Sequence, residues 1–133
     1  MNNPVFVAYV ITTAVLGLNL LVLANTEPPA LFRNDVQGGS WLEVRAQGRA
    51  PNPWSLGARV RVQVHEGGPW QLREIGVGSH LFGQGEAVAH VGLGEGSEPV
   101  HRVEVTWPAT GEQVVLEGVA RDHRIVVEQG AGA

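Results

Sequence analysis

The chain has no cysteine and no lysine among its 133 residues. The absence of cysteine excludes disulfide bonds, thiolate metal sites and a cysteine nucleophile, so a folded domain must be held by its apolar core alone. All nine basic residues are arginines, and 13 acidic residues give a net charge of −4. This balance argues against a nucleic-acid-binding protein, which would normally carry a basic face.

Charged residues are also absent from the beginning of the chain, where the first one is Glu27. The run from Val5 to Ala24 is almost wholly apolar and is about as long as a bilayer-spanning helix. It predicts a transmembrane anchor helix over residues 1–26, followed by a proline-containing linker over residues 27–40. Two alternatives remain open, namely a cleaved signal peptide with its small residues near Ala24 and a buried helix of a soluble core.

Small and polar residues interrupt the predicted helix at Thr12, Thr13, Gly17 and Asn19. Thr13 and Gly17 are four residues apart, a spacing that lets a second helix approach closely. The amide of Asn19 would need a hydrogen-bond partner in lipid. We therefore predict that these four residues bind other transmembrane subunits; the alternative is that their polar groups are satisfied within their own helix.

From Trp41 onward, apolar and polar residues alternate with the period of half-buried strands. About seven such runs, separated by glycine and proline turns, predict an all-β domain over residues 41–129, followed by a short tail at 130–133. The expected architecture is a small antiparallel sandwich or barrel, preceded by the one transmembrane helix.

The order and spacing of several segments resemble the ASPIC/UnbV domain. These segments are Leu31–Asp35, Trp41–Arg45, Gly57–Val62, Gln71–Ile75, His90–Gly94, Val103–Pro108 and Leu116–Ala120 with Asp122, and together they span residues 31–129. In that family the domain usually follows FG-GAP or VCBS-type propeller repeats in secreted or surface proteins. The resemblance implies an extracytoplasmic β domain without an established catalytic activity, and here a membrane helix stands in the place of the propeller.

The predicted helix and the resemblance together give the expected location. The helix would cross the bacterial inner membrane once. The resemblance implies that the C-terminal domain lies in the periplasm, so the N-terminus is expected inside. Arg33, the basic residue nearest to the predicted helix, mildly favours the opposite orientation by its charge alone.

Two features of the β domain are candidate partner-binding sites. Trp54 lies in a proline-braced loop where the family often has a polar one, and a rigidly held, exposed tryptophan suits a protein contact. Folding back over the end of the β domain is the alternative. Arg59 and Arg61 share the outward face of one predicted strand, with Arg73 expected beside them, and predict a cationic strip for an acidic partner. The alternative is that these arginines pair with nearby glutamates.

No catalytic, cofactor or metal site is expected. None of the five histidines has a compact metal-ligand spacing, and no aspartate-rich calcium loop occurs. An enzyme would depend on Ser79 and His80, which as strand neighbours would point to opposite faces.

The sequence therefore predicts a non-catalytic, single-pass accessory or stabilising subunit of a larger membrane complex, respiratory or photosynthetic. Its expected partners are other transmembrane subunits with their periplasmic parts, and membrane lipid. The alternative is a surface-tethered module that binds a glycan or a peptide.

Overall fold

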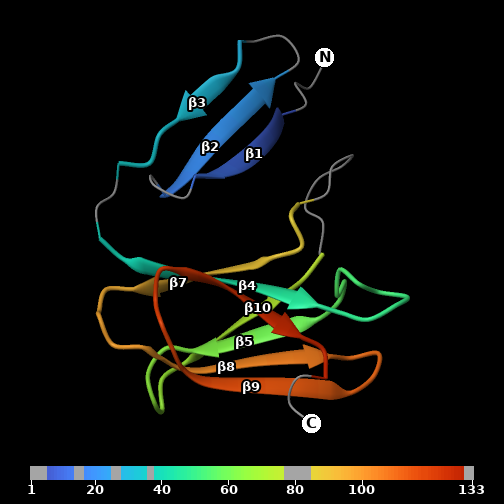
Figure 1. The fold of residues 1–133 in the computed structure, drawn as a ribbon. Coiled ribbons are helices and arrows are strands. Elements are labelled where there is room, and N and C mark those ends of the chain that lie inside the picture. Colours follow the sequence, from blue (N-terminus) through green and yellow to red (C-terminus); the bar gives the residue numbers. More distant parts are fainter. Residues whose placement is uncertain (1–5, 14–16, 25–27, 36–37, 77–84, 131–133) are drawn as a thin grey trace. The chain divides into compact units, whose positions relative to one another are not determined.

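The structure, a computed structural model, describes residues 6–13, 17–24, 28–35, 38–76 and 85–130. The chain divides into two compact units, residues 1–37 and 38–133 (Figure 1). All regular elements in the described ranges are strands, so the all-β prediction is confirmed for this part of the chain.

The first unit contains one antiparallel sheet. Strands β1 (Phe6–Thr13), β2 (Gly17–Ala24) and β3 (Ala30–Phe32) follow one another in the order β1-β2-β3. Leu31 and Phe32 of β3 are 66% and 57% exposed, so the apolar side chains of this strand are not covered within the unit.

This sheet is a correction to the predicted transmembrane helix over residues 1–26, which is not confirmed. The part of the chain described here holds no helix with the length and apolar character needed to span a membrane. A purely apolar run has no period that separates a helix from strands, and valine, isoleucine, threonine and aromatic residues, which are frequent in this run, favour strands.

The change from helix to strands alters the neighbours of the predicted helix-binding residues. Thr13 and Gly17, four apart on one helical face, are instead cross-strand partners at the junction of β1 and β2. Thr12 lies opposite Leu18, and Asn19 lies opposite Ile11. The four residues therefore do not form a helical packing face in the structure.

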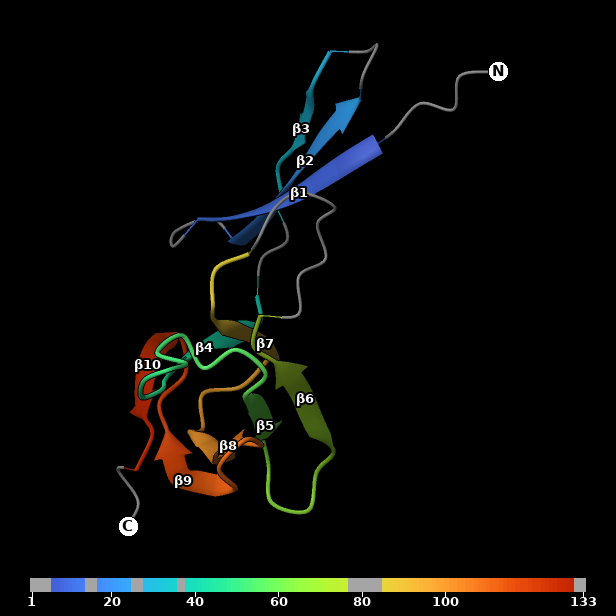
Figure 2. The same cartoon turned by 90° about the vertical axis from the view of Figure 1, so that its right-hand side faces the viewer.

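The second unit is a two-layer sandwich of seven strands in its described residues. Figures 1 and 2 show its two sheets as separate layers. One sheet has the order β10-β4-β7, formed by β4 (Ser40–Gln47), β7 (Ala89–Gly94) and β10 (His123–Glu128). The other has the order β6-β5-β8-β9, formed by β5 (Arg59–Gln63), β6 (Trp70–Glu74), β8 (Val100–Trp107) and β9 (Glu112–Val119).

One strand pair departs from the antiparallel prediction. Strand β10 runs parallel to β4, with His123 opposite Leu42 and Glu128 opposite Gln47. The other ladders of this unit are antiparallel. The parallel pair brings the last strand of the chain beside the first strand of the sandwich, so residues about 80 positions apart become neighbours.

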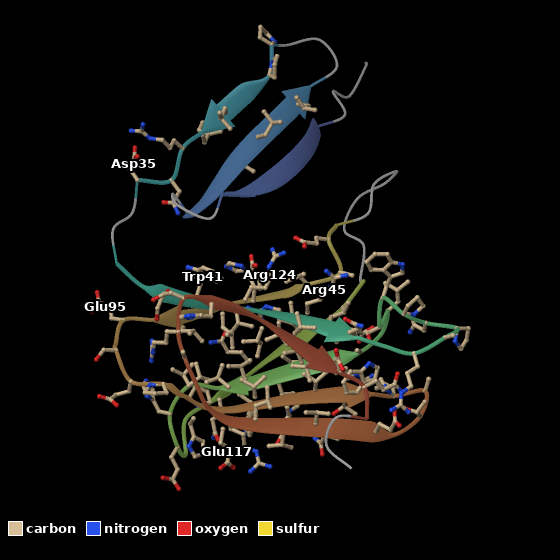
Figure 3. All side chains as sticks on the ribbon, in the orientation of Figure 1. Asp35, Trp41, Arg45, Glu95, Glu117 and Arg124 are labelled. Atoms are coloured by element: carbon tan, nitrogen blue, oxygen red, sulfur yellow. The ribbon has the colours of Figure 1, made fainter. Side chains whose placement is uncertain are left out.

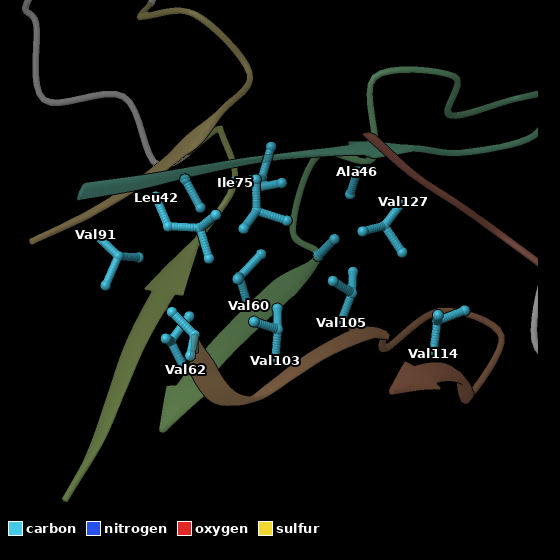
Figure 4. Close-up of a cluster of buried hydrophobic side chains, with 14 of the residues drawn as sticks. Leu42, Ala46, Val60, Val62, Ile75, Val91, Val103, Val105, Val114 and Val127 are labelled. Carbon is cyan, nitrogen blue, oxygen red and sulfur yellow. The ribbon is translucent and has the colours of Figure 1, made fainter. Parts of the chain in front are cut away.

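The core lies between the two sheets, as the close-up in Figure 4 shows. Val60 and Val62 point inward, as predicted from the alternation, and are fully buried. Each buried aliphatic side chain stabilises the fold by about 1.5–3 kcal/mol. The buried side chains come from both sheets and from adjoining loops: Leu42, Val44, Ala46, Ala58, Val60, Val62, Ile75, Ala89, Val91, Leu93, Val100, Val103, Val105, Trp107, Val114 and Val127.

Candidate docking surface

The loop between β4 and β5 is held by its own hydrogen bonds. The amide of Gly48 donates to the carbonyl oxygen of Pro53 at 3.1 Å, closing the base of the loop. The side chain of Asn52 bonds twice to Leu56, donating to its carbonyl oxygen at 2.9 Å and accepting from its amide at 3.0 Å. A Cβ atom at Gly48 would lie 2.2 Å from the carbonyl oxygen of Asn52, so the loop closes only with glycine at that position.

The same loop is tied to the core through Ser55. This serine is fully buried and has a φ of 52°, a left-handed backbone conformation that residues other than glycine rarely adopt. Its hydroxyl accepts a 2.8 Å hydrogen bond from the indole Nε1 of the buried Trp107. The loop is therefore built around a buried polar contact, and Trp54 is positioned by the residue that follows it.

Trp54 is presented to solvent by this loop, with 58% of its surface exposed. The structure thus favours the exposed position over the alternative of a ring folded into the domain. The guanidinium of Arg45, on β4, lies 5.6 Å from the centre of the Trp54 ring, within the range of a cation–π contact. Val126, 54% exposed, is the cross-strand neighbour of Arg45 on β10. We call Arg45, Trp54 and Val126 the Trp54 surface.

Arg45 differs from the other arginines because it forms no hydrogen bond or ion pair within the described residues. The others pair with carboxylates or donate to backbone oxygens: Arg33, Arg49, Arg59, Arg61, Arg102 and Arg124 to carboxylates, and Arg73 and Arg121 to carbonyl groups. The Trp54 surface therefore offers a guanidinium whose donors are not used by any described residue, which the sequence pattern did not reveal.

A charged cluster lies farther along the same sheet face. Figure 3 shows Trp41, Arg124 and Arg45 along this face. The carboxylate of Glu43 is almost buried and accepts a 2.6 Å hydrogen bond from Nε of Arg124, while Nδ1 of His90 lies 3.3 Å away. Arg124 also binds both carboxylate oxygens of Glu86. We call Glu43, Glu86, His90 and Arg124 the Glu43 cluster.

The ionisation of Glu43 reflects this environment. Burial raises the pKa of its carboxyl group, but the hydrogen bonds and charges of Arg124 and His90 outweigh that effect and hold the pKa of Glu43 below its ordinary value of 4.5. At neutral pH the carboxylate of Glu43 is therefore ionised, and Arg124 and His90 of the same chain are its partners.

Arg59 and Arg61 do lie together on the outward face of the other sheet, as predicted. Both are paired, however: Arg61 lies 3.2 Å from Glu104, and Arg59 lies 3.6 Å from Glu74. Arg61 is also 4.3 Å from the centre of the Trp70 ring. This geometry fits the alternative of a paired, solvated face better than that of a free cationic strip.

Arg73 does not join that pair. Arg73 belongs to β6 and is the cross-strand partner of Val60 on β5. It therefore lies on the other side of the sheet from Arg59 and Arg61. Its guanidinium donates to the carbonyl oxygen of His90 at 3.1 Å. The two sheets are therefore joined at this edge by a side chain that was expected on the outer face.

No group of three metal-ligating side chains comes together in the ranges that the structure describes. Ser79 and His80, on which nucleophilic catalysis would depend, lie outside the described residues. Thr12, Thr13, Gly17 and Asn19 belong to β1 and β2, in the other unit from Trp54.

The comparisons with known proteins place the second unit in a family. The model of the family described as ASPIC and UnbV matches residues 48–133, which include the Trp54 loop and six of the seven strands of the sandwich. The chain belongs to the ASPIC/UnbV family. No curated protein matches the chain. The match confirms the resemblance from residue 48 onward, whereas the segments Leu31–Asp35 and Trp41–Arg45 lie outside the matched residues. Strand β4, which precedes residue 48, completes the sheet on which Arg45 lies.

Proposed function

We propose that the ASPIC/UnbV sandwich is a non-catalytic docking module that binds a partner protein through the Trp54 surface. The observation that carries the proposal is Trp54 itself, which is more than half exposed on a loop held by hydrogen bonds and by the buried Ser55. A large ring held rigidly loses little entropy on binding, which is why tryptophan is common among residues that dominate interface energies.

The surrounding chemistry supports docking rather than catalysis. Trp54 is accompanied by one exposed valine and by the guanidinium of Arg45, which is unpaired within the part of the chain that the structure describes. The nearly buried carboxylates of Glu43 and Glu104, in contrast, are each bound by arginines of the same chain. Glutamates fixed in this way are poor proton-transfer groups, since their partners stabilise the charged form.

We also propose that the module is an accessory or stabilising part of a membrane assembly and lies outside the cytoplasm. Support comes from the run of residues 5–24, which is apolar at nearly every position. Strands with such continuous apolar sequence are typical of sheets covered on both faces, and Leu31 and Phe32 of the same sheet are exposed. We propose that the partner assembly supplies that cover.

The test is purification of the full chain from its native membranes in mild detergent, followed by mass spectrometry. We expect the wild-type chain to retain a stoichiometric partner protein, and Trp54→Ala to weaken the complex about thirtyfold, because a central aromatic anchor is worth about 2 kcal/mol or more. Val115→Ala, a truncation of a 39% exposed side chain on the other sheet, is the matched control. A wild-type chain that is always recovered alone would contradict the proposal.

A surface module for glycans is the second candidate, since an exposed indole ring can also stack on a sugar face. The exposed Trp54 is the observation that favours it. The two candidates differ in what is retained with the wild-type chain, a protein or a saccharide.

A further inference from the structure

We propose that Arg45 and Trp54 form a binding site for a carboxylate flanked by apolar side chains, carried by a peptide segment of the partner protein. The inference rests on the docking function proposed above and names the chemistry that the Trp54 surface recognises. The site combines an exposed indole ring, an exposed valine and a guanidinium that forms no hydrogen bond or ion pair with the residues described in the structure.

The guanidinium of Arg45 is suited to binding an anion. Arginine carries five N–H donors in a planar fork that matches the two oxygens of a carboxylate. In the described residues, Arg45 uses none of them in a hydrogen bond or ion pair, although Glu128 lies on the same face of the neighbouring strand, diagonally from it. Arg45 lies instead over the ring of Trp54, where its donors remain available to a ligand.

The cation–π contact pre-positions the guanidinium. Trp54 is fixed by its loop, so a side chain lying 5.6 Å from its ring centre is restricted before any ligand arrives. A group that is already ordered loses less entropy on binding, and the ring limits access of water to one face of the guanidinium. Both effects strengthen a charge-assisted hydrogen bond to an incoming carboxylate.

The neighbours of Arg45 favour a peptide over an acidic sugar. Trp54 and Val126 present apolar surface on either side of the cation. A uronic acid would need polar partners for its hydroxyl groups, but the carboxylates of Glu43 and Glu86 are already bound to Arg124. An aspartate or glutamate flanked by leucine-like or aromatic residues places its charge on Arg45 and its apolar groups on the two flanks.

The experiment is selection from a random peptide library displayed on phage, with the full chain as bait. We expect wild type to enrich peptides that carry aspartate or glutamate next to apolar residues. Arg45→Met keeps most of the apolar stem but removes the charge, and should weaken binding of a selected peptide about tenfold, as should replacing the acidic residue of that peptide by its amide. Arg45→Lys should recover only part of the affinity, since an ammonium cannot engage both oxygens in the same plane.

The outcomes separate this inference from the docking function. Arg33→Met, which removes another exposed arginine, is the control and should leave peptide binding unchanged. One contrary result is that selected peptides bind Trp54→Ala more weakly than wild type and yet carry no preferred acidic residue; another is that they bind Arg45→Met as tightly as wild type. Either result would overturn the carboxylate site and leave docking through Trp54 intact. Peptides that bind Trp54→Ala as tightly as wild type would count against the docking function as well. Binding of uronate-containing glycans that depends on Arg45, with no peptide selected, would overturn the peptide assignment.

Discussion

Replacing Arg121 by methionine is expected to destabilise the sandwich by about 3 kcal/mol, because this buried side chain joins three segments of the chain. Arg121 is only 8% exposed. Its Nε donates to the carbonyl oxygen of Glu98, and its Nη1 donates to the hydroxyl of Ser40 at 2.7 Å and lies 3.5 and 3.4 Å from the carbonyl oxygens of Leu93 and Gly94.

Two opposing effects decide the size of this loss. Removing the guanidinium relieves the cost of burying a charge, and one of its nitrogens, Nη2, has no hydrogen-bond partner among the described residues. Against that, methionine removes the donor from the backbone oxygens of Glu98, Leu93 and Gly94, of which the contact with Leu93 is buried and the other two are part-buried. An unsatisfied buried group costs about 1–3 kcal/mol. Because Arg121 has several acceptors and one orphaned nitrogen, we expect the loss of hydrogen bonds to prevail.

Urea unfolding of the full chain, followed by tryptophan fluorescence, measures this effect, since all four tryptophans belong to the second unit. Arg121→Lys should recover less than half of the loss, because one ammonium group cannot span the separate acceptors. Arg59→Met is the control, with an expected change of about 0.5 kcal/mol or less, since its ion pair is exposed. A loss from Arg121→Met no larger than that of the control would contradict the role given to Arg121.

Replacing Arg124 by methionine is expected to destabilise the sandwich by about 2 kcal/mol at neutral pH, because Glu43 would keep its charge but lose its closest partner. Glu43 is 8% exposed. Without Arg124, its carboxylate would keep the contact with Nδ1 of His90, which lies 3.3 Å from Oε1. The double variant Glu43→Gln with Arg124→Met should recover part of the loss, since it removes the unpaired charge.

The pH dependence of this loss has a definite sign. In the wild type the folded state holds the pKa of Glu43 below 4.5, so its contribution is fully present above that pH and is lost as the pH falls toward the folded-state pKa. In Arg124→Met, burial is no longer offset by the arginine, and protonation of Glu43 relieves the penalty. The difference in unfolding free energy between the two proteins should therefore shrink below pH 4.5. A difference that stays constant, or grows, on acidification would contradict this account.

A small β domain, sandwich or barrel, could be predicted because its strands alternate with period two. Val60 and Val62 face the core and Arg59 and Arg61 face outward, as the pattern indicates. The parallel pairing of β10 with β4 could not be predicted, since nothing local in either strand identifies its partner. That pairing creates the contact between Glu43 and Arg124, which are 81 residues apart.

The candidate site was predicted only in part. The two prolines that precede Trp54, Pro51 and Pro53, indicated a rigid loop, and the ring of Trp54 is exposed in the structure. Arg45 was not singled out, because an outward arginine on a strand looks the same in sequence whether it is paired or free. The predicted helix is not confirmed because its only signal was apolar length, which continuous strands share.

The central claim, that the sandwich docks on a partner protein through the Trp54 surface, is tested most directly by photo-crosslinking in the native cells. A photoreactive phenylalanine derivative replaces Val126 of the full chain, which is 54% exposed on the Trp54 surface, so that Trp54 itself is kept; position 72, which is 55% exposed on the other sheet, is the matched comparison. We predict a covalent adduct with one second protein from position 126 and none from position 72. No protein adduct from position 126, or the same adducts from both positions, would contradict the claim.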